Sequence, residues 1–210
     1  MGKVIAFSNQ KGGSGKTTLT ANIAVLWSNS GYKVAVIDAD AQQSLTYWLE
    51  ERKKYYGEHD IGIKKFNFDI RNLYEEIKQI KRKFDFILID SPPSITFDTI
   101  QILKASDRVY VPAQPTPLDL MATLPFLNVA KQEKKHPIIF LNRVMPRAKL
   151  TEAMILRLRY AGAKIARSRI SSKIIFAETF AVGRGVVDIS VTSDAAKEII
   201  KAGNEILRNL

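Results

Sequence analysis

A glycine-rich run near the start of the chain constrains the fold more than any other feature of the sequence. It lies between a short β-branched segment and a segment with helical periodicity, and its residues are Lys11-Gly12-Gly13-Ser14-Gly15-Lys16-Thr17-Thr18. The glycines let backbone N–H groups converge on phosphate oxygens without clashes from Cβ atoms. The following helix adds the positive end of its dipole, Lys16 can reach β- and γ-phosphate oxygens, and the Thr17 hydroxyl can ligate Mg²⁺. The run therefore predicts a phosphate-binding loop between a first strand and a first helix.

Short β-branched segments alternate with longer helical segments along most of the chain. Residues 34–37 and 86–89 are continuously apolar, as expected of strands that are covered on both faces. This alternation predicts an α/β fold: a doubly wound, mostly parallel sheet with helices on both faces. The predicted strands are residues 4–8, 33–38, 63–68, 85–90, 108–112 and 137–142, with a strand and turn at 164–173. The predicted helices are residues 16–30, 43–56, 69–83, 97–105, 118–135 and 150–161.

The C-terminal segment has the pattern of an amphipathic helix over residues 193–210. Ser193 or Asp194 can cap it, and its apolar residues fall at the spacing of a single stripe. Its polar side carries mixed charges and lacks Trp and Phe, whereas a helix on a membrane surface would have a strongly basic face with aromatic residues. The segment is therefore predicted to pack on the sheet, with no membrane as a partner.

Composition excludes several classes of protein. Hydrophobic residues make up 46% and charged residues 25% of the chain, which is typical of globular domains. The chain has no cysteine, so disulfides, a thiolate nucleophile and cysteine-ligated clusters are excluded. It has no signal-peptide pattern and no run of 18 apolar residues. We expect a single domain over residues 1–210, no separate N-terminal DNA-binding domain, and a cytoplasmic protein.

Positive charge is concentrated in one fifth of the chain. The formal net charge is +11, and residues 131–173 contain twelve Lys and Arg against two Glu, a net of +10. Such a local excess favours a polyanionic partner. A solvated basic face would have the same composition, so composition alone leaves both interpretations open.

The glycine-rich run departs from the usual P-loop, because Gln10 stands where glycine is usual and Lys11 is an added lysine. In this respect it resembles the deviant Walker A motif of the ParA/MinD family of P-loop ATPases, and the resemblance extends through most of the chain. The segment Val36-Ile37-Asp38-Ala39-Asp40-Ala41-Gln42 is similar to a second family motif, with Ala41 in place of the usual proline. Similar matches are Phe86-Ile87-Leu88-Ile89-Asp90-Ser91-Pro92-Pro93, residues 107–112 followed by 115–119, and Phe140-Leu141-Asn142-Arg143.

The resemblance implies ATP and Mg²⁺ as ligands and assigns roles to individual residues. Lys11, Lys16 and Asp40 are implied to be catalytic, with Asp40 positioning the attacking water. Thr17, Asp38 and Asp90 are implied to serve the metal, Asp90 through metal-bound water, because Asp38 and Asp90 end predicted strands at the ligand-binding edge of the sheet. The nucleotide is implied to contact residues 11–18 together with Asn142 and Arg143. In this family the signature lysine, here Lys11, reaches the nucleotide of a second subunit, which implies an ATP-dependent homodimer.

Two functional classes are compatible with these motifs. The first is a small ParA-type partition ATPase that binds DNA nonspecifically in its ATP state, on the nucleoid, and is stimulated by a ParB-like centromere-binding protein. The second is a MinD-like or other intracellular cargo-positioning ATPase of the same family. The basic segment favours the first class, since phosphate contacts need only basic side chains. The predicted DNA-binding residues are Arg147, Lys149, Arg157, Arg159, Arg167, Arg169 and Lys173.

Overall fold

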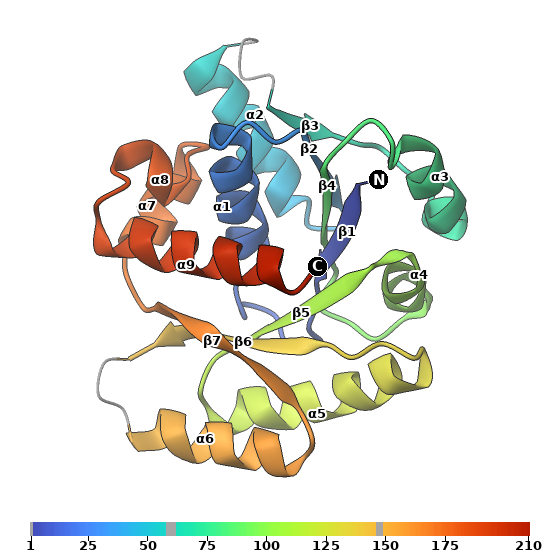
Figure 1. The fold of residues 1–210 in the computed structure, drawn as a ribbon, viewed down its shortest axis with the longest axis vertical. Helices are drawn as coiled ribbons and strands as arrows, with labels where there is room; N and C mark the ends of the chain where they lie inside the picture. The colour runs from blue at the N-terminus through green and yellow to red at the C-terminus, as the bar shows by residue number, and fades with distance from the viewer. Residues whose placement is uncertain (1, 58–61, 146–148) are drawn as a thin grey trace.

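A parallel β-sheet forms the centre of the protein (Figure 1). The computed structural model describes residues 2–57, 62–145 and 149–210; of residues 149 and 150 it describes only the backbone. Within these ranges the sheet has seven strands in the order β3-β2-β4-β1-β5-β6-β7, and all neighbouring strands are parallel. The strands are β1 (Lys3–Phe7), β2 (Val34–Asp38), β3 (Ile63–Lys65), β4 (Phe86–Asp90), β5 (Arg108–Ala113), β6 (Ile138–Val144) and β7 (Lys164–Ser171). The predicted α/β fold is confirmed.

Helices cover both faces of the sheet. One hydrophobic core joins α1, α2, α7, α8 and α9 to one face, and two smaller clusters join α3, α4, α5 and α6 to the other. The helices are α1 (Lys16–Asn29), α2 (Ser44–Tyr56), α3 (Leu73–Ile80), α4 (Phe97–Ala105), α5 (Pro117–Gln132), α6 (Lys149–Tyr160), α7 (Ile175–Ala181), α8 (Val186–Ile189) and α9 (Asp194–Arg208). No helix among the described residues is long and apolar enough to span a membrane.

Strand β1 explains how the sheet supports two cores. Ile5 and Phe7 pack with the α1 and α9 layer, whereas Val4 and Ala6 pack with the α3 and α4 layer. All four side chains are fully buried. Because successive side chains of a strand point to opposite faces, a continuous apolar run fills both cores at once.

The carboxyl ends of the central strands bring predicted site residues together. Phe7, Asp90 and Asp38 are the last residues of three adjacent strands, and Asp90 lies in register with both of the others. The glycine-rich run leaves β1 at this edge of the sheet and leads directly into α1.

Some predicted boundaries differ from the structure. The strand predicted over 63–68 ends at Lys65, because Phe66 and Phe68 turn to pack against the cluster beneath α3. The helix predicted over 69–83 begins as a 3-10 turn, η1 (Ile70–Asn72), with Asp69 accepting from the Arg71 N–H; the α-helix starts at Leu73. Helices α7 and α8 were not predicted from the sequence.

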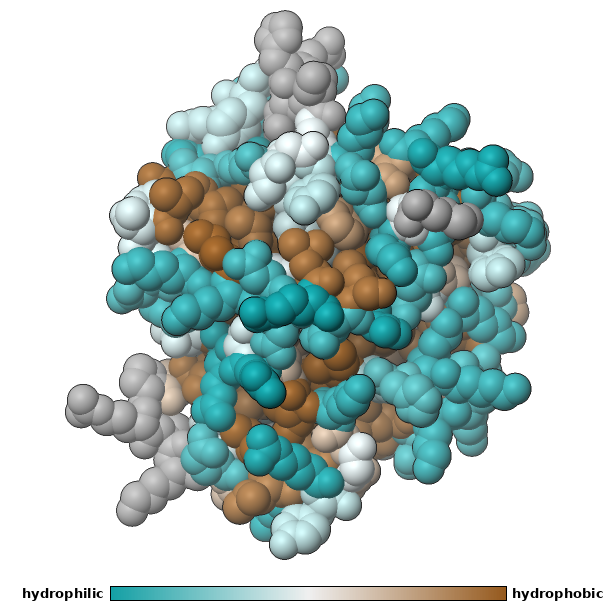
Figure 2. Space-filling view, viewed as in Figure 1, coloured by the Kyte–Doolittle hydropathy of each residue, from teal (hydrophilic) through white to brown (hydrophobic). Residues whose placement is uncertain are grey.

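The C-terminal helix α9 confirms its predicted packing. Ser193 caps it by accepting a hydrogen bond from the Ala196 N–H at 3.2 Å. Ala195, Ala196, Ile199, Ala202 and Ile206 join the core shared with α1 and the sheet. At Gly203 an added Cβ would lie 2.4 Å from a methyl group of Leu26, so the helix approaches α1 closely. In Figure 1, α9 crosses in front of α1, and Figure 2 shows apolar surface gathered on this face of the molecule between polar groups.

Candidate functional site

The loop between β1 and α1, residues 8–15, is shaped by its glycines. Gly13 and Gly15 have φ angles of 72° and 97°, in the left-handed region that favours glycine. An added Cβ at Gly15 would lie 1.9 Å from Nδ2 of Asn142. We call this loop the P-loop, because it leads directly into α1, and the first N–H groups of a helix have no partner within the helix and can bind phosphate.

Hydrogen bonds within the P-loop and to the ends of β5 and β6 hold the loop in place. The Asn9 amide donates to the Pro112 carbonyl at 2.7 Å and its oxygen accepts from the Lys11 N–H at 3.2 Å. The Gln114 amide donates to the Gly13 carbonyl at 3.2 Å. The Asn142 amide donates to the Ser14 carbonyl at 2.8 Å. Asn142, predicted to contact the nucleotide, thus lies beside the loop and uses one amide hydrogen to hold its backbone.

Lys16 is a buried cation at the start of α1. Its residue is 5% exposed, and its ammonium group donates to the Lys11 carbonyl at 3.4 Å. Burial lowers the pKa of Lys16, while the charges of Asp90 and Asp40 oppose this shift. A desolvated ammonium group at this position is stabilised by a bound anion. Lys11, in contrast, is exposed.

Asp90 is fully buried beside the loop. Neither of its carboxylate oxygens has a hydrogen-bond partner among the described residues. Burial raises the pKa of Asp90 to about 7; the nearby Thr17 hydroxyl and Lys16 ammonium group oppose the shift, although neither is close enough to make a well-formed hydrogen bond with the carboxylate. The buried hydroxyls of Ser8 and Ser14 also lack partners in the described structure. Buried polar groups without partners are rare in proteins and point to a bound ligand, ion or water.

Asp38 and Asp40 shape the loop between β2 and α2. Asp38 accepts hydrogen bonds from the N–H groups of Thr46 at 2.7 Å and Asp40 at 3.3 Å. Asp40 accepts from the Gln42 N–H at 3.0 Å. No three His, Cys, Asp or Glu side chains in the described ranges gather closely enough to hold a metal ion by themselves. The metal-site assignment of Thr17, Asp38 and Asp90 therefore stays a prediction.

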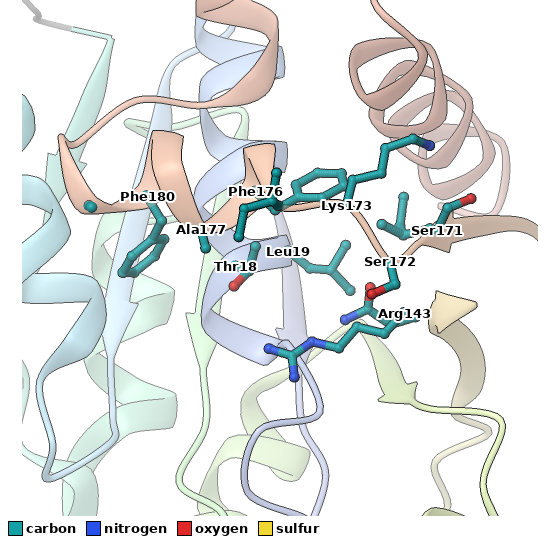
Figure 3. Close-up of a pocket in the computed structure, with 13 residues that line it drawn as sticks. Thr18, Leu19, Arg143, Ser171, Ser172, Lys173, Phe176, Ala177 and Phe180 are labelled. Atoms are coloured by element: carbon teal, nitrogen blue, oxygen red, sulfur yellow. The ribbon is translucent and has the colours of Figure 1, made fainter. Parts of the chain in front are cut away.

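A pocket of about 590 Å³ lies beside the start of α1 (Figure 3). Thr18 and Leu19 of α1 form one wall, and Figure 3 shows Phe176, Ala177 and Phe180 of α7 beside them. The remaining walls come from the ends of β6 and β7, with Asn142, Arg143, Ile170, Ser171, Ser172 and Lys173. Arg143 is exposed and has a φ angle of 51°, which is unusual for a residue with a side chain.

Arg143 was predicted at the site from the sequence, whereas the wall that follows β7 was not. Residues 171–173 and α7 carry no recognisable motif, and they are about thirty residues from Arg143 in sequence. One signal could have found them. In a parallel sheet, the segment after the carboxyl end of the strand next to β6 must lie at the same edge.

The predicted DNA-binding residues have different surroundings. Arg157 and Arg159 are exposed on α6, and Arg167 is exposed on β7. Arg169 forms an ion pair with Glu152 at 3.0 Å, and Lys173 forms one with Glu198. Arg147 lies outside the described residues, and the side chain of Lys149 is not described.

Two glutamates of α9 neutralise part of the basic segment. Glu198 accepts from the Ser171 N–H at 2.9 Å, and Glu205 accepts from the N–H groups of Arg167 and Ser168, both at 2.7 Å. These carboxylates satisfy backbone donors on the outer edge of β7. They lie 27 to 38 residues after these donors in the sequence. Both glutamates lie beyond residue 173, so the net charge of +10 counted for residues 131–173 does not include them.

Comparison with known proteins gives matches over nearly the whole chain. The family model described as CobQ/CobB/MinD/ParA nucleotide binding domain matches residues 5–186. Maintenance of carboxysome distribution protein A from Halothiobacillus neapolitanus is 27% identical over 210 residues, covering 97% of this chain and 95% of that protein. The chromosome-partitioning ATPase Soj from Treponema pallidum is 25% identical, covering 99% and 98%. The structure of the cell division ATPase MinD from Pyrococcus furiosus has a TM-score of 0.81 at 26% identity and covers all of both chains. These matches confirm the resemblance inferred from the motifs.

Proposed function

The chain belongs to the CobQ/CobB/MinD/ParA nucleotide-binding family, and we propose that it is a partition ATPase. In this proposal it binds ATP in the P-loop, dimerises around the nucleotide, binds DNA nonspecifically and hydrolyses ATP when a ParB-like protein stimulates it. The observation that carries the proposal is the set of buried, unpaired polar groups at the P-loop, above all the Asp90 carboxylate and the poorly partnered Lys16 ammonium group. A phosphate would pair with the Lys16 ammonium group, and a cation bound with that phosphate would pair with the Asp90 carboxylate.

The P-loop residues supply the binding contacts for the triphosphate. The N–H groups of residues 12–18 and the Lys16 ammonium group stabilise the β- and γ-phosphates, as in other P-loop proteins. Asn142 keeps the Ser14 and Gly15 backbone in the conformation that this requires. The pocket beside α1 has an apolar wall and is lined by Asn142, whose amide donates to the Ser14 carbonyl of the P-loop, so it suits the adenine base.

The donors beside the P-loop fit a magnesium ion that is bound together with the triphosphate. Thr17 supplies a hydroxyl at the start of α1, and the unpaired oxygens of Asp90 are suited to hold metal-bound water. Mg²⁺ neutralises the charge that develops on the phosphates during phosphoryl transfer. In this proposal Asp40 orients the attacking water, and the hydrogen bond from its N–H to Asp38 at the end of β2 supports that role.

The exposed Lys11 makes dimerisation depend on ATP. Two copies that face each other across this edge would bring two lysines together, and the phosphate charges offset their repulsion. Sedimentation should therefore show a shift from monomer to dimer on addition of ATP, and Lys11→Ala should abolish the shift. A dimer that forms equally without nucleotide would contradict this arrangement.

The positive charge of the chain supports DNA as the partner of the ATP state. The chain has a formal net charge of +11, and Arg157, Arg159 and Arg167 are exposed. A second candidate, an ATPase that positions a protein assembly, is favoured by the similarity to the carboxysome distribution protein along almost its whole length. Both candidates bind and hydrolyse ATP in the same way, and they differ in the process that the ATP-bound state serves: DNA partition or the positioning of a protein assembly.

Fluorescence anisotropy of a labelled random duplex tests the DNA proposal. Binding should require ATP rather than ADP, and Arg167→Glu should lower the salt slope by about one unit of log K per log salt for each phosphate that is no longer neutralised. ATP affinity should stay unchanged. Arg82→Glu, which reverses an exposed arginine outside the basic segment, is the control. Weak DNA binding that is the same with ATP and ADP, and is unchanged by Arg167→Glu, would favour the candidate that positions a protein assembly.

A further inference from the structure

A buried ion pair fastens α2 to α8. Nη1 of Arg52 lies 2.7 Å from Oδ2 of Asp188, and the two side chains are 4% and 6% exposed. The guanidinium group also donates to the Gly183 carbonyl at 3.2 Å and lies over the rings of Trp48 and Tyr56. Two buried charges compensate their desolvation only in a well-defined geometry. The pair therefore fixes where α2 lies relative to α8 as well as holding the two together.

The other end of α2 carries the loop that contains Asp40. The Thr46 N–H in the first turn of α2 donates to Asp38, and the Gln42 N–H donates to Asp40 itself. Gln43, between them, has a φ angle of 52°, an uncommon conformation that persists only when surrounding contacts impose it. Arg52 follows Thr46 by six residues, about 9 Å along a continuous helix. A shift of α2 at Arg52 is therefore passed to the Asp40 loop.

Asp188 is in turn held to the helix that begins at the P-loop. Its carboxylate accepts from the Gly185 N–H at 2.9 Å and from the Asn29 amide at 3.1 Å. The neighbouring Val186 N–H donates to the Asn22 oxygen at 2.9 Å. Asn22 and Asn29 both belong to α1. The Arg52 partner thus has a fixed position relative to the P-loop.

The segment before α8 also contacts the pocket beside α1. Phe180 of α7 lines that pocket (Figure 3) and stacks on Trp48 of α2, with 6.3 Å between ring centroids and 28° between planes. The Trp48 indole donates to the Arg184 carbonyl at 3.3 Å. Segment 173–188 therefore touches the pocket, α1 and α2 together.

We propose that Arg52 is a positioning residue for ATP hydrolysis: its ion pair with Asp188 holds α2, and with it Asp40, at a fixed place relative to the P-loop. The part that concerns hydrolysis rests on the proposed function. Apolar side chains of similar volume can hold two helices as firmly as a buried ion pair. Apolar contacts are non-directional, however, so they permit small displacements that the ion pair forbids.

The double variant Arg52→Met/Asp188→Leu separates positioning from stability. It removes both charges of the pair while keeping an apolar contact, so neither Arg52 nor Asp188 is left as a buried charge facing an apolar residue. The matched control is Glu51→Leu/Lys54→Met, which removes an ion pair of 2.6 Å on the same helix in which Lys54 is largely exposed. Thermal unfolding, amide hydrogen exchange at Gln42 and Thr46, and kcat and KM for ATP are measured on both variants and the wild type.

We expect the double variant to fold with a melting temperature below that of the wild type, because the Gly185 N–H and the Gly183 carbonyl lose their partners; exchange and kinetics are therefore compared well below that temperature. Exchange at Gln42 and Thr46 should be about tenfold faster, kcat should fall about tenfold, and KM should stay within about twofold, whereas the control should change none of these. Wild-type exchange at these amides, or a wild-type kcat, would overturn the proposal. If the wild-type protein hydrolyses no ATP, the proposed function fails, and the exchange measurement alone decides whether the ion pair fixes the Asp40 loop.

Discussion

Replacing Asp90 with asparagine should stabilise the ligand-free protein more at pH 8 than at pH 5. Burial raises the pKa of Asp90 from its ordinary 3.8 to about 7 in the folded protein. Because the folded-state pKa is the higher one, the folded protein binds this proton more tightly than the unfolded chain does. The resulting stability is complete below about pH 4 and is lost as the pH rises through 7.

The magnitude follows from the size of the pKa difference. One unit is worth about 1.4 kcal/mol, so a difference of about 3 units corresponds to about 4 kcal/mol over the whole range and about 2–3 kcal/mol between pH 5 and pH 8. Urea unfolding of the wild type and Asp90→Asn with EDTA present measures it, since the other titrating groups are common to both proteins. Between pH 5 and pH 8, the free energy of unfolding of Asp90→Asn should rise relative to that of the wild type by about 2–3 kcal/mol. A gap that is constant with pH would refute the description of Asp90 as a buried carboxyl group without a partner.

Three further substitutions test the site and the fold. Gly15→Ala places a Cβ against the Asn142 amide and should weaken ATP binding at least about tenfold by calorimetry, because the backbone there is left-handed; unchanged affinity would contradict the loop geometry. Asp40→Ala should keep ATP affinity and lower turnover about 100-fold or more, and wild-type turnover would assign the attacking water to another residue. Lys134→Gly should raise the free energy of unfolding by about 1 kcal/mol in urea, since Lys134 follows the C-cap of α5 in a left-handed conformation with φ at 56°; a loss of stability would contradict this.

Local patterns in the sequence were sufficient to predict the sheet and the P-loop. The run at residues 86–89 is apolar on both faces, and the structure buries every residue of it. The P-loop could be located because its glycines, Lys16 and Thr17 are adjacent in the sequence and form one recognisable pattern. Asp38 and Asp90 could be placed at one edge because parallel strands end there.

Contacts between distant parts of the chain could not be predicted in the same way. Asn142 and Ser14 are 128 residues apart, and nothing in either segment indicates that the Asn142 amide holds the loop. Glu205 belongs to a helix whose pattern indicates burial, while its own contact is with the backbone of β7. Helix α7 has only seven residues, too few for a reliable helical period. Such contacts depend on the register between elements, which only the folded chain defines.

Strained and unpaired groups give evidence for the site that does not depend on any motif. Of the three non-glycine residues with positive φ in the described ranges, Gln43 and Arg143 flank the P-loop, in the loop that leads into α2 and at the end of β6. Ser8, Ser14 and Asp90 are buried without partners in the same region. Each of these features lowers stability and persists only where the surrounding structure imposes it. The stable cores on either side of the sheet impose them here, so the fold holds polar groups ready at one edge, where a phosphate and its cation would supply the missing partners.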